Sequence, residues 1–126
     1  MHIRRMLSLL LLLPVSLFAH CVDLAGSYSA HGTDPSTGPY TASVQISEPN
    51  EAGVFNIFWW FNDGSTSSGS GVRQDDELSI IYLLGSSYGT QAYKISSHNH
   101  HILLSGPYLE YGDTVPGHET LTKNHD

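Results

Sequence analysis

The stretch Val54-Phe55-Asn56-Ile57-Phe58-Trp59-Trp60-Phe61 decides the fold, because it is the most apolar of several short segments that alternate in pattern. Successive side chains of a β-strand point to opposite faces. One face of this segment is wholly apolar: Phe55, Ile57, Trp59 and Phe61. The other face includes Asn56, which is costly to bury without partners. The pattern therefore predicts a strand with Trp59 pointing inward and Trp60 outward.

Period-two alternation recurs on both sides of this stretch, and turn residues separate the segments. No segment shows sustained helical periodicity. We predict eight strands, at 28–32, 40–47, 54–61, 65–73, 78–84, 90–96, 102–109 and 118–123. Asn62-Asp63-Gly64 predicts a type I′ hairpin turn, since this turn requires positive φ angles. Residues 85–89 are expected to form another turn, and residues 98–101 a third.

Short, regularly spaced turns favour sequential hairpins, because neighbouring elements usually pair. An open eight-strand meander would leave two exposed edges, and closure into a barrel removes them. The sequence therefore predicts one all-β domain over residues 20–126, an eight-stranded antiparallel up-and-down β-barrel. A two-sheet β-sandwich is the alternative.

Residues 1–19 have the pattern of a signal peptide rather than of the fold. Arg4 and Arg5 precede a short leucine-rich run, and a small residue, Ala19, follows it. The run is too short to span a bilayer. We expect cleavage after Ala19 and an exported protein, either periplasmic or secreted. Cys21 follows the cleavage site, but His20 takes the place where a lipobox carries a small residue, so we expect no lipid anchor.

The charge of the expected mature chain excludes some partners. Three basic residues remain after cleavage, Arg73, Lys94 and Lys123, against 12 acidic ones, which gives a formal charge of −9. So few cations cannot neutralise a phosphate backbone, which excludes nucleic acid as a partner. Anionic lipid headgroups are disfavoured for the same reason.

An ordered series of short motifs covers nearly all of the expected mature chain. It comprises Gly26-Ser27-Tyr28, Gly32-Thr33-Asp34-Pro35, Tyr40, Trp59, Gly69-Ser70-Gly71, Tyr93-Lys94-Ile95, Leu104-Ser105-Gly106 and Glu119-Thr120-Leu121. In this series the chain resembles small exported bacterial β-barrel proteins of unknown function, some of which carry a fibronectin-binding label. Their topology is similar to that of lipocalins and avidin. Ala42 stands where the pattern has Gly, and the family supplies no catalytic residues.

Several polar motifs resemble parts of catalytic or metal-binding sites. Gly85-Ser86-Ser87-Tyr88-Gly89 matches the nucleophile elbow of hydrolases, but that motif needs a following helix and a large parallel sheet. Asp75-Asp76-Glu77 lacks the ligand spacing of a calcium loop. Glu119, on the last predicted strand, either lines the barrel mouth or faces solvent. We therefore predict no enzyme activity and no cofactor.

Histidines are the only candidate metal ligands, because imidazoles two residues apart on a strand can chelate a metal. The weak candidates are His20, His98, His100 and His118. A surface hairpin turn is the alternative explanation for the cluster at 98–101. We favour no metal site.

The leading functional hypothesis is a barrel that binds a small ligand or a protein partner. Its candidate interior residues are Phe55, Ile57, Trp59 and Tyr93. The alternative is that these four form a plain filled core, because eight-stranded barrels often fill themselves with side chains. One alternative is an adhesion or inhibitor-type module that acts through an outer aromatic patch at Phe58 and Trp60. The same patch would support weak self-association. The N-terminal segment covering Phe58 and Trp60 is the other explanation for this patch. The other alternative is a small copper or zinc protein that uses the histidines.

Overall fold

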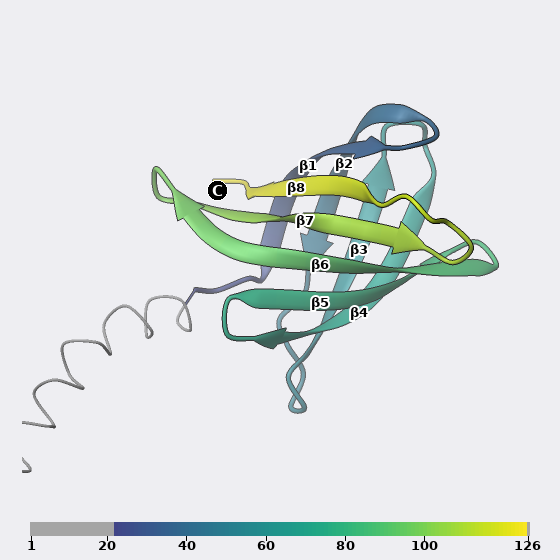
Figure 1. Cartoon of the computed structure of the whole chain (residues 1–126). Coiled ribbons are helices and arrows are strands. Elements are labelled where there is room, and N and C mark those ends of the chain that lie inside the picture. Colours follow the sequence, from purple (N-terminus) through teal and green to yellow (C-terminus); the bar gives the residue numbers. More distant parts are fainter. Residues whose placement is uncertain (1–21, 126) are drawn as a thin grey trace, which may run out of the picture.

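The chain forms a closed, eight-stranded antiparallel β-barrel (Figure 1). We describe residues 22–125 of a computed structural model. The strands are β1 (Gly26–Asp34), β2 (Gly38–Ile46), β3 (Val54–Phe61), β4 (Thr66–Gln74), β5 (Glu77–Leu84), β6 (Ser87–His98), β7 (His101–Glu110) and β8 (Gly117–Lys123). Each strand pairs with the next, and β8 pairs with β1 from Tyr28↔Lys123 to Thr33↔His118. This last pairing confirms the predicted barrel and excludes the two-sheet sandwich.

The turn predictions were partly wrong. Asn62-Asp63-Gly64 does not form a type I′ turn, because only Gly64 of the three has positive φ, and its N–H donates to the Phe61 carbonyl (2.9 Å). A type I′ turn, with two positive φ angles, fits Asn99-His100 instead. The turn expected at residues 85–89 is only two residues long, because Ser87 already pairs with Leu84.

Alternate side chains of every strand fill the barrel interior. On β3, Phe55, Ile57 and Trp59 are buried, whereas Trp60 is 50% exposed and Trp59 only 4%. The predicted orientation of the two tryptophans is therefore confirmed. Three successive interior positions of β4 are small, namely Ser67, Gly69 and Gly71, and a Cβ atom on either glycine would lie 2.6–2.7 Å from a carbonyl oxygen of β5.

One end of the barrel is closed by the segment that precedes β1. Leu24 is buried in the core, and its carbonyl accepts a hydrogen bond from the Tyr28 hydroxyl (2.7 Å). Arg73 Nη1 donates to the Val22 carbonyl (2.6 Å), and Lys123 Nζ donates to the Asp23 carbonyl (2.8 Å). Within the described residues, this segment covers the barrel end and not Trp60. None of residues 22–125 belongs to a helix long and apolar enough to cross a membrane.

Candidate ligand-binding site

The opposite end of the barrel contains a cavity of about 310 Å³ that opens to solvent. This volume lies at the lower end of the range of small-molecule sites, roughly 300–1,000 Å³. Five aromatic side chains line it: Tyr40, Trp59, Phe61, Tyr82 and Tyr108. Four acidic side chains line it as well: Asp34, Asp63, Glu110 and Glu119. We call this space the mouth cavity.

The base of the mouth cavity is organised around Glu119, which is 3% exposed. Its Oε1 atom accepts hydrogen bonds from Tyr93 Oη (2.5 Å) and Trp59 Nε1 (3.0 Å), and its Oε2 atom accepts one from Tyr40 Oη (2.6 Å). An ionised carboxylate only accepts hydrogen bonds, so three converging donors satisfy it. The donors come from β6, β3 and β2, so the carboxylate of β8 connects four strands of the barrel.

Three of the tyrosines of the cavity each lie over a glycine of the neighbouring strand. Tyr40 is paired with Gly32, Tyr82 with Gly89 and Tyr108 with Gly117. A Cβ atom on any of these glycines would lie 2.2–2.4 Å from the tyrosine ring. The missing side chains thus leave the space in which the rings lie, an arrangement known to compensate for glycine in sheets.

A second hydrogen-bonded group forms the rim. Tyr108 Oη donates to Asp34 Oδ1 (2.9 Å), and Asp34 Oδ2 accepts from the N–H groups of Ser36 (3.0 Å) and Thr37 (3.2 Å). Hydrogen bonds from Ser36 lower the pKa of Asp34, and the bond from Tyr108 adds to this effect. Asp34 is therefore ionised at neutral pH and holds both the β1–β2 turn and the Tyr108 ring.

Tyr82 is the unsatisfied polar group of the mouth cavity. Its side chain is 8% exposed, and its hydroxyl, although buried, has no hydrogen-bond partner among residues 22–125. Burial raises the pKa of Tyr82, and nearby carboxylates, Glu110 first, raise it further, so the hydroxyl stays protonated. A buried polar group without a partner costs about 1–3 kcal/mol, which a bound polar atom would relieve.

The four predicted interior residues lie at different depths. Trp59 lines the mouth cavity, and Tyr93 lies at its base as a donor to Glu119. Phe55 and Ile57 are buried in the core and do not line the cavity. The predicted alternation of inward and outward side chains along β3 is correct. The pattern of one strand does not show, however, which inward side chains lie near the open end of the barrel.

Tyr40, Tyr82, Tyr108 and Asp34 were not among the predicted site residues. A sequence signal exists for two of these tyrosines, because Tyr40 and Gly32, and Tyr82 and Gly89, are equally far from the connection between their strands. In an up-and-down barrel such positions pair across a hairpin, so glycine opposite tyrosine at two hairpins on the same end marks the site. Tyr108 and Gly117 are not equally far from theirs, so that pair follows only from the register.

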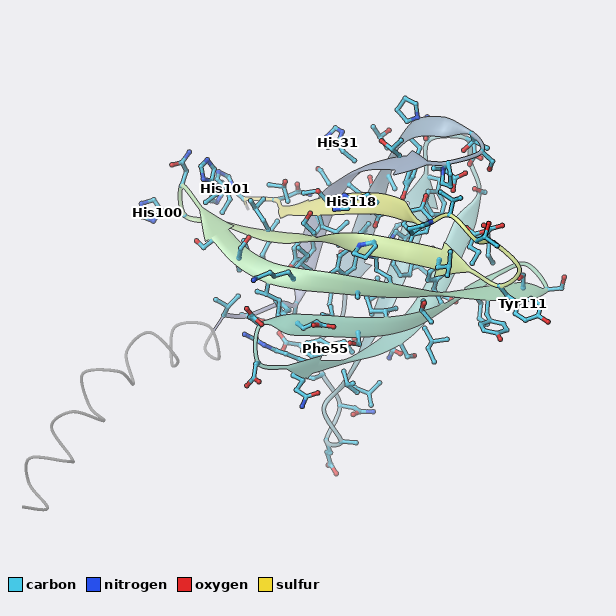
Figure 2. The ribbon with its side chains drawn as sticks, viewed as in Figure 1. His31, Phe55, His100, His101, Tyr111 and His118 are labelled. Atoms are coloured by element: carbon cyan, nitrogen blue, oxygen red, sulfur yellow. The ribbon has the colours of Figure 1, made fainter. Side chains whose placement is uncertain are left out.

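The candidate metal ligands do not come together. His20 lies outside the described residues. The turn at Asn99-His100 pairs His98 with His101 and turns His100 outward, while His118 lies on the wall formed by β8 (Figure 2). His101 Nε2 instead approaches His125 Nε2 at 3.2 Å. Residues 22–125 hold no group of three or more His, Cys, Asp or Glu side chains placed for a metal ion.

The other polar motifs also lie in hairpins. Ser87, the nucleophile position of the hydrolase-like motif, begins β6, so a strand follows it in place of the helix that an elbow requires. Asp75 and Asp76 form the β4–β5 turn, where Asp76 Oδ2 lies 3.9 Å from Lys94 Nζ.

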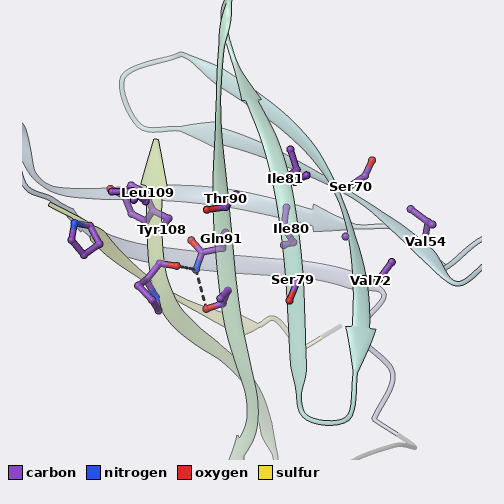
Figure 3. A pocket seen from close by; sticks show the side chains of 14 residues that line it. Val54, Ser70, Val72, Ser79, Ile80, Ile81, Thr90, Gln91, Tyr108 and Leu109 are labelled. Atoms are coloured by element: carbon purple, nitrogen blue, oxygen red, sulfur yellow. Dashed lines mark hydrogen bonds between the residues drawn. The ribbon is translucent and has the colours of Figure 1, made fainter. Parts of the chain in front are cut away.

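A larger hollow, of about 710 Å³, lies on the outer wall over β3–β7 (Figure 3). Beneath it the β6–β7 ladder is interrupted, because Pro107 has no N–H to donate. The buried Gln91 amide compensates by donating to the carbonyls of Gly106 and Pro107, both at 3.0 Å. The side-chain amide of Gln91 is therefore hydrogen-bonded within the protein, unlike the Tyr82 hydroxyl.

Comparisons of the chain with protein-family models and with curated proteins give no match.

Proposed function

We propose that this protein is an exported, non-enzymatic β-barrel that binds a small ligand in the mouth cavity. One observation carries the proposal: a cavity of about 310 Å³ with aromatic walls has polar groups already fixed at its base by the bonds to Glu119. Apolar walls with a few well-placed polar groups are typical of small-molecule sites. Fixed side chains also lower the entropy that binding must overcome.

A pair of neighbouring substitutions tests the proposal. Leu84 is half-buried and lines the mouth cavity, whereas Leu83 points outward and is 58% exposed. Leu84→Trp should fill the cavity, and Leu83→Trp should leave it open. Compounds from a small-molecule collection that raise the melting temperature of the natural protein should still stabilise Leu83→Trp but not Leu84→Trp. Equal stabilisation of both variants would place the binding site elsewhere.

A protein-binding module is the second candidate, and the outer wall favours it. Phe58, Trp60, Ile81 and Leu83 form an outer patch on β3 and β5, and the last three are 50–62% exposed. Ser68 of β4 pairs with Phe58 on one side and with Leu83 on the other. Because its side chain is small, no bulky group stands between the apolar side chains of β3 and those of β5. Exposed apolar patches commonly mark contact sites.

Self-association is the simplest form of this second function to measure. Sedimentation velocity at increasing concentration should show dimers that Trp60→Ser together with Ile81→Ser abolishes. If the protein remains a monomer at all concentrations tested, self-association through the outer patch is excluded.

A further inference from the structure

The two ends of the barrel differ in charge. Three acidic residues of the mouth cavity, Asp34, Glu110 and Glu119, belong to β1, β7 and β8, and Asp63 lies in the β3–β4 connection. Among the described residues, no Lys, Arg or His lines the cavity. The carboxylates of the cavity therefore have no lysine or arginine among their lining neighbours to offset their negative charge.

The three lysine and arginine residues of the described chain belong to the closed end. Arg73 and Lys123 hold the segment before β1 through the carbonyls of Val22 and Asp23. Lys94 lies beside Asp76 in the β4–β5 turn, which is at that same end. The barrel thus keeps its cations at one end and leaves carboxylates alone at the other.

Glu110 is the carboxylate best placed to gain from a bound cation. No side-chain hydrogen bond to its carboxylate is found within residues 22–125, in contrast to Asp34, Asp63 and Glu119. Partial burial raises the pKa of Glu110, and the charges of Asp34 and Asp113 raise it further. A positive charge between these groups would relieve their mutual repulsion.

The aromatic walls suit the same kind of ligand. Trp59 and Tyr82 lie with ring centroids 5.8 Å apart at 58°, and Tyr40 and Tyr108 lie 6.4 Å apart at 73°. Rings set at such angles offer faces to a guest from more than one side. Cations bind aromatic faces, and this attraction grows as the cation loses water.

The unpartnered Tyr82 hydroxyl is an independent observation that points to a polar ligand atom in this space. It belongs to a side chain that is more than nine-tenths buried and lines the cavity. A hydroxyl oxygen can accept a hydrogen bond from an ammonium N–H.

From these features, and resting on the proposed ligand-binding role, we propose that the mouth cavity selects a small organic cation: a protonated amine carried on an apolar or aromatic body. The body contacts the rings of Trp59, Tyr82 and Tyr108. The ammonium group lies toward Glu110 and Asp34 and donates to the Tyr82 hydroxyl. An anion of the same size would be repelled, because the charged groups of the cavity lining are all carboxylates. A neutral ligand would leave the repulsion among those carboxylates in place.

Three probes of similar size test this selection: 2-phenylethylamine, which is protonated at pH 7, 2-phenylethanol, which is neutral, and 3-phenylpropanoate, which is an anion. Binding is measured by calorimetry, and by Trp59 fluorescence in the Trp60→Phe variant, which retains one of the two tryptophans. We expect the amine to bind at least tenfold more tightly than the alcohol, and the carboxylate not to bind. The preference should fall as salt is added, because partly exposed charges are screened.

Two substitutions and a control connect the preference to the cavity. Glu110→Gln should reduce the preference for the amine over the alcohol by about fivefold or more. Tyr82→Phe, as a separate variant, should also weaken binding of the amine. Glu51→Gln removes one charge from the exposed β2–β3 connection and should change nothing. Melting temperatures of the variants establish that each is folded.

The outcomes separate this inference from the proposed function. Equal binding of amine and alcohol, or tighter binding of the carboxylate, would overturn the cationic ligand while keeping a binding cavity. Failure of all three probes at millimolar concentration would also overturn it. In that case the comparison of Leu83→Trp with Leu84→Trp, made with uncharged and anionic compounds, decides independently whether the cavity binds any ligand.

Discussion

Replacing Glu119 tests the structure of the mouth cavity directly, because three donors depend on one carboxylate. In Glu119→Gln the amide oxygen can still accept from Trp59 and Tyr93, but the NH₂ group then faces the Tyr40 hydroxyl, which must accept instead of donating. Hydrogen bonds to charged groups contribute about 1.5–3 kcal/mol and neutral ones about 0.5–1.5. Two bonds that lose their charge assistance therefore cost about 2 kcal/mol in unfolding free energy.

Glu119→Leu should be more severe. It leaves Trp59 Nε1 and Tyr93 Oη without an acceptor, and both side chains are buried. An unsatisfied buried donor costs about 1–3 kcal/mol, so the expected loss is about 4 kcal/mol. Tyr40 is only half-buried and can donate to water, so it adds little. For a domain of this size the loss is a large part of the total stability, which is about 5–15 kcal/mol.

Urea unfolding followed by tryptophan fluorescence measures the series. Glu51→Gln, on an exposed turn, is the matched control and should stay within about 0.5 kcal/mol of the natural protein. The expected order of stability is Glu51→Gln, then Glu119→Gln, then Glu119→Leu. If Glu119→Leu is as stable as Glu119→Gln, the three donors do not depend on this carboxylate, and our account of the cavity base is wrong.

Three further predictions concern the same barrel. Trp59→Ala should cost about 3–5 kcal/mol in unfolding free energy and Trp60→Ala less than about 1, as urea midpoints would show, and the reverse order would contradict the register of β3. Gly32→Ala should displace the Tyr40 ring, because the new Cβ would lie 2.2 Å from it, and a crystal structure with the Tyr40–Glu119 bond intact would contradict this close packing. Glu110 has a raised pKa in the folded state, so its ionisation opposes folding once the pH rises above its unfolded value of about 4.5. Glu110→Gln should therefore stabilise the protein at pH 7 and not at pH 3, and an equal effect at both pH values would exclude this linkage.

Much of the fold could be predicted from the sequence alone. Alternation of apolar and polar residues reports directly which side chains face the interior, because the period of a strand is two. The segment 54–61 therefore predicted both β3 and the orientation of Trp59. Short connections between eight such segments predicted sequential pairing, and the cost of free edges predicted closure.

Details of the turns depended on pairing between strands. Residues 85–89 carry two glycines and a serine pair, which is typical of a loop, yet Ser87 belongs to β6 because it pairs with Leu84. At Asn62-Asp63-Gly64 the side chain of Asp63 accepts bonds from Ser65 and the turn contains three residues rather than two. Register across a hairpin, rather than local composition, fixed these boundaries.

The mouth cavity was decided by tertiary structure. Glu119 lies 26 residues from Tyr93, 60 from Trp59 and 79 from Tyr40, and nothing in the pattern around it distinguished a buried carboxylate from one that faces solvent. Its three donors meet it only because closure of β8 onto β1 places these strands around one interior. The period of a strand determines the face on which a side chain lies, but the depth of that side chain in the barrel, and the partners it meets across the interior, depend on the registers of all eight pairings.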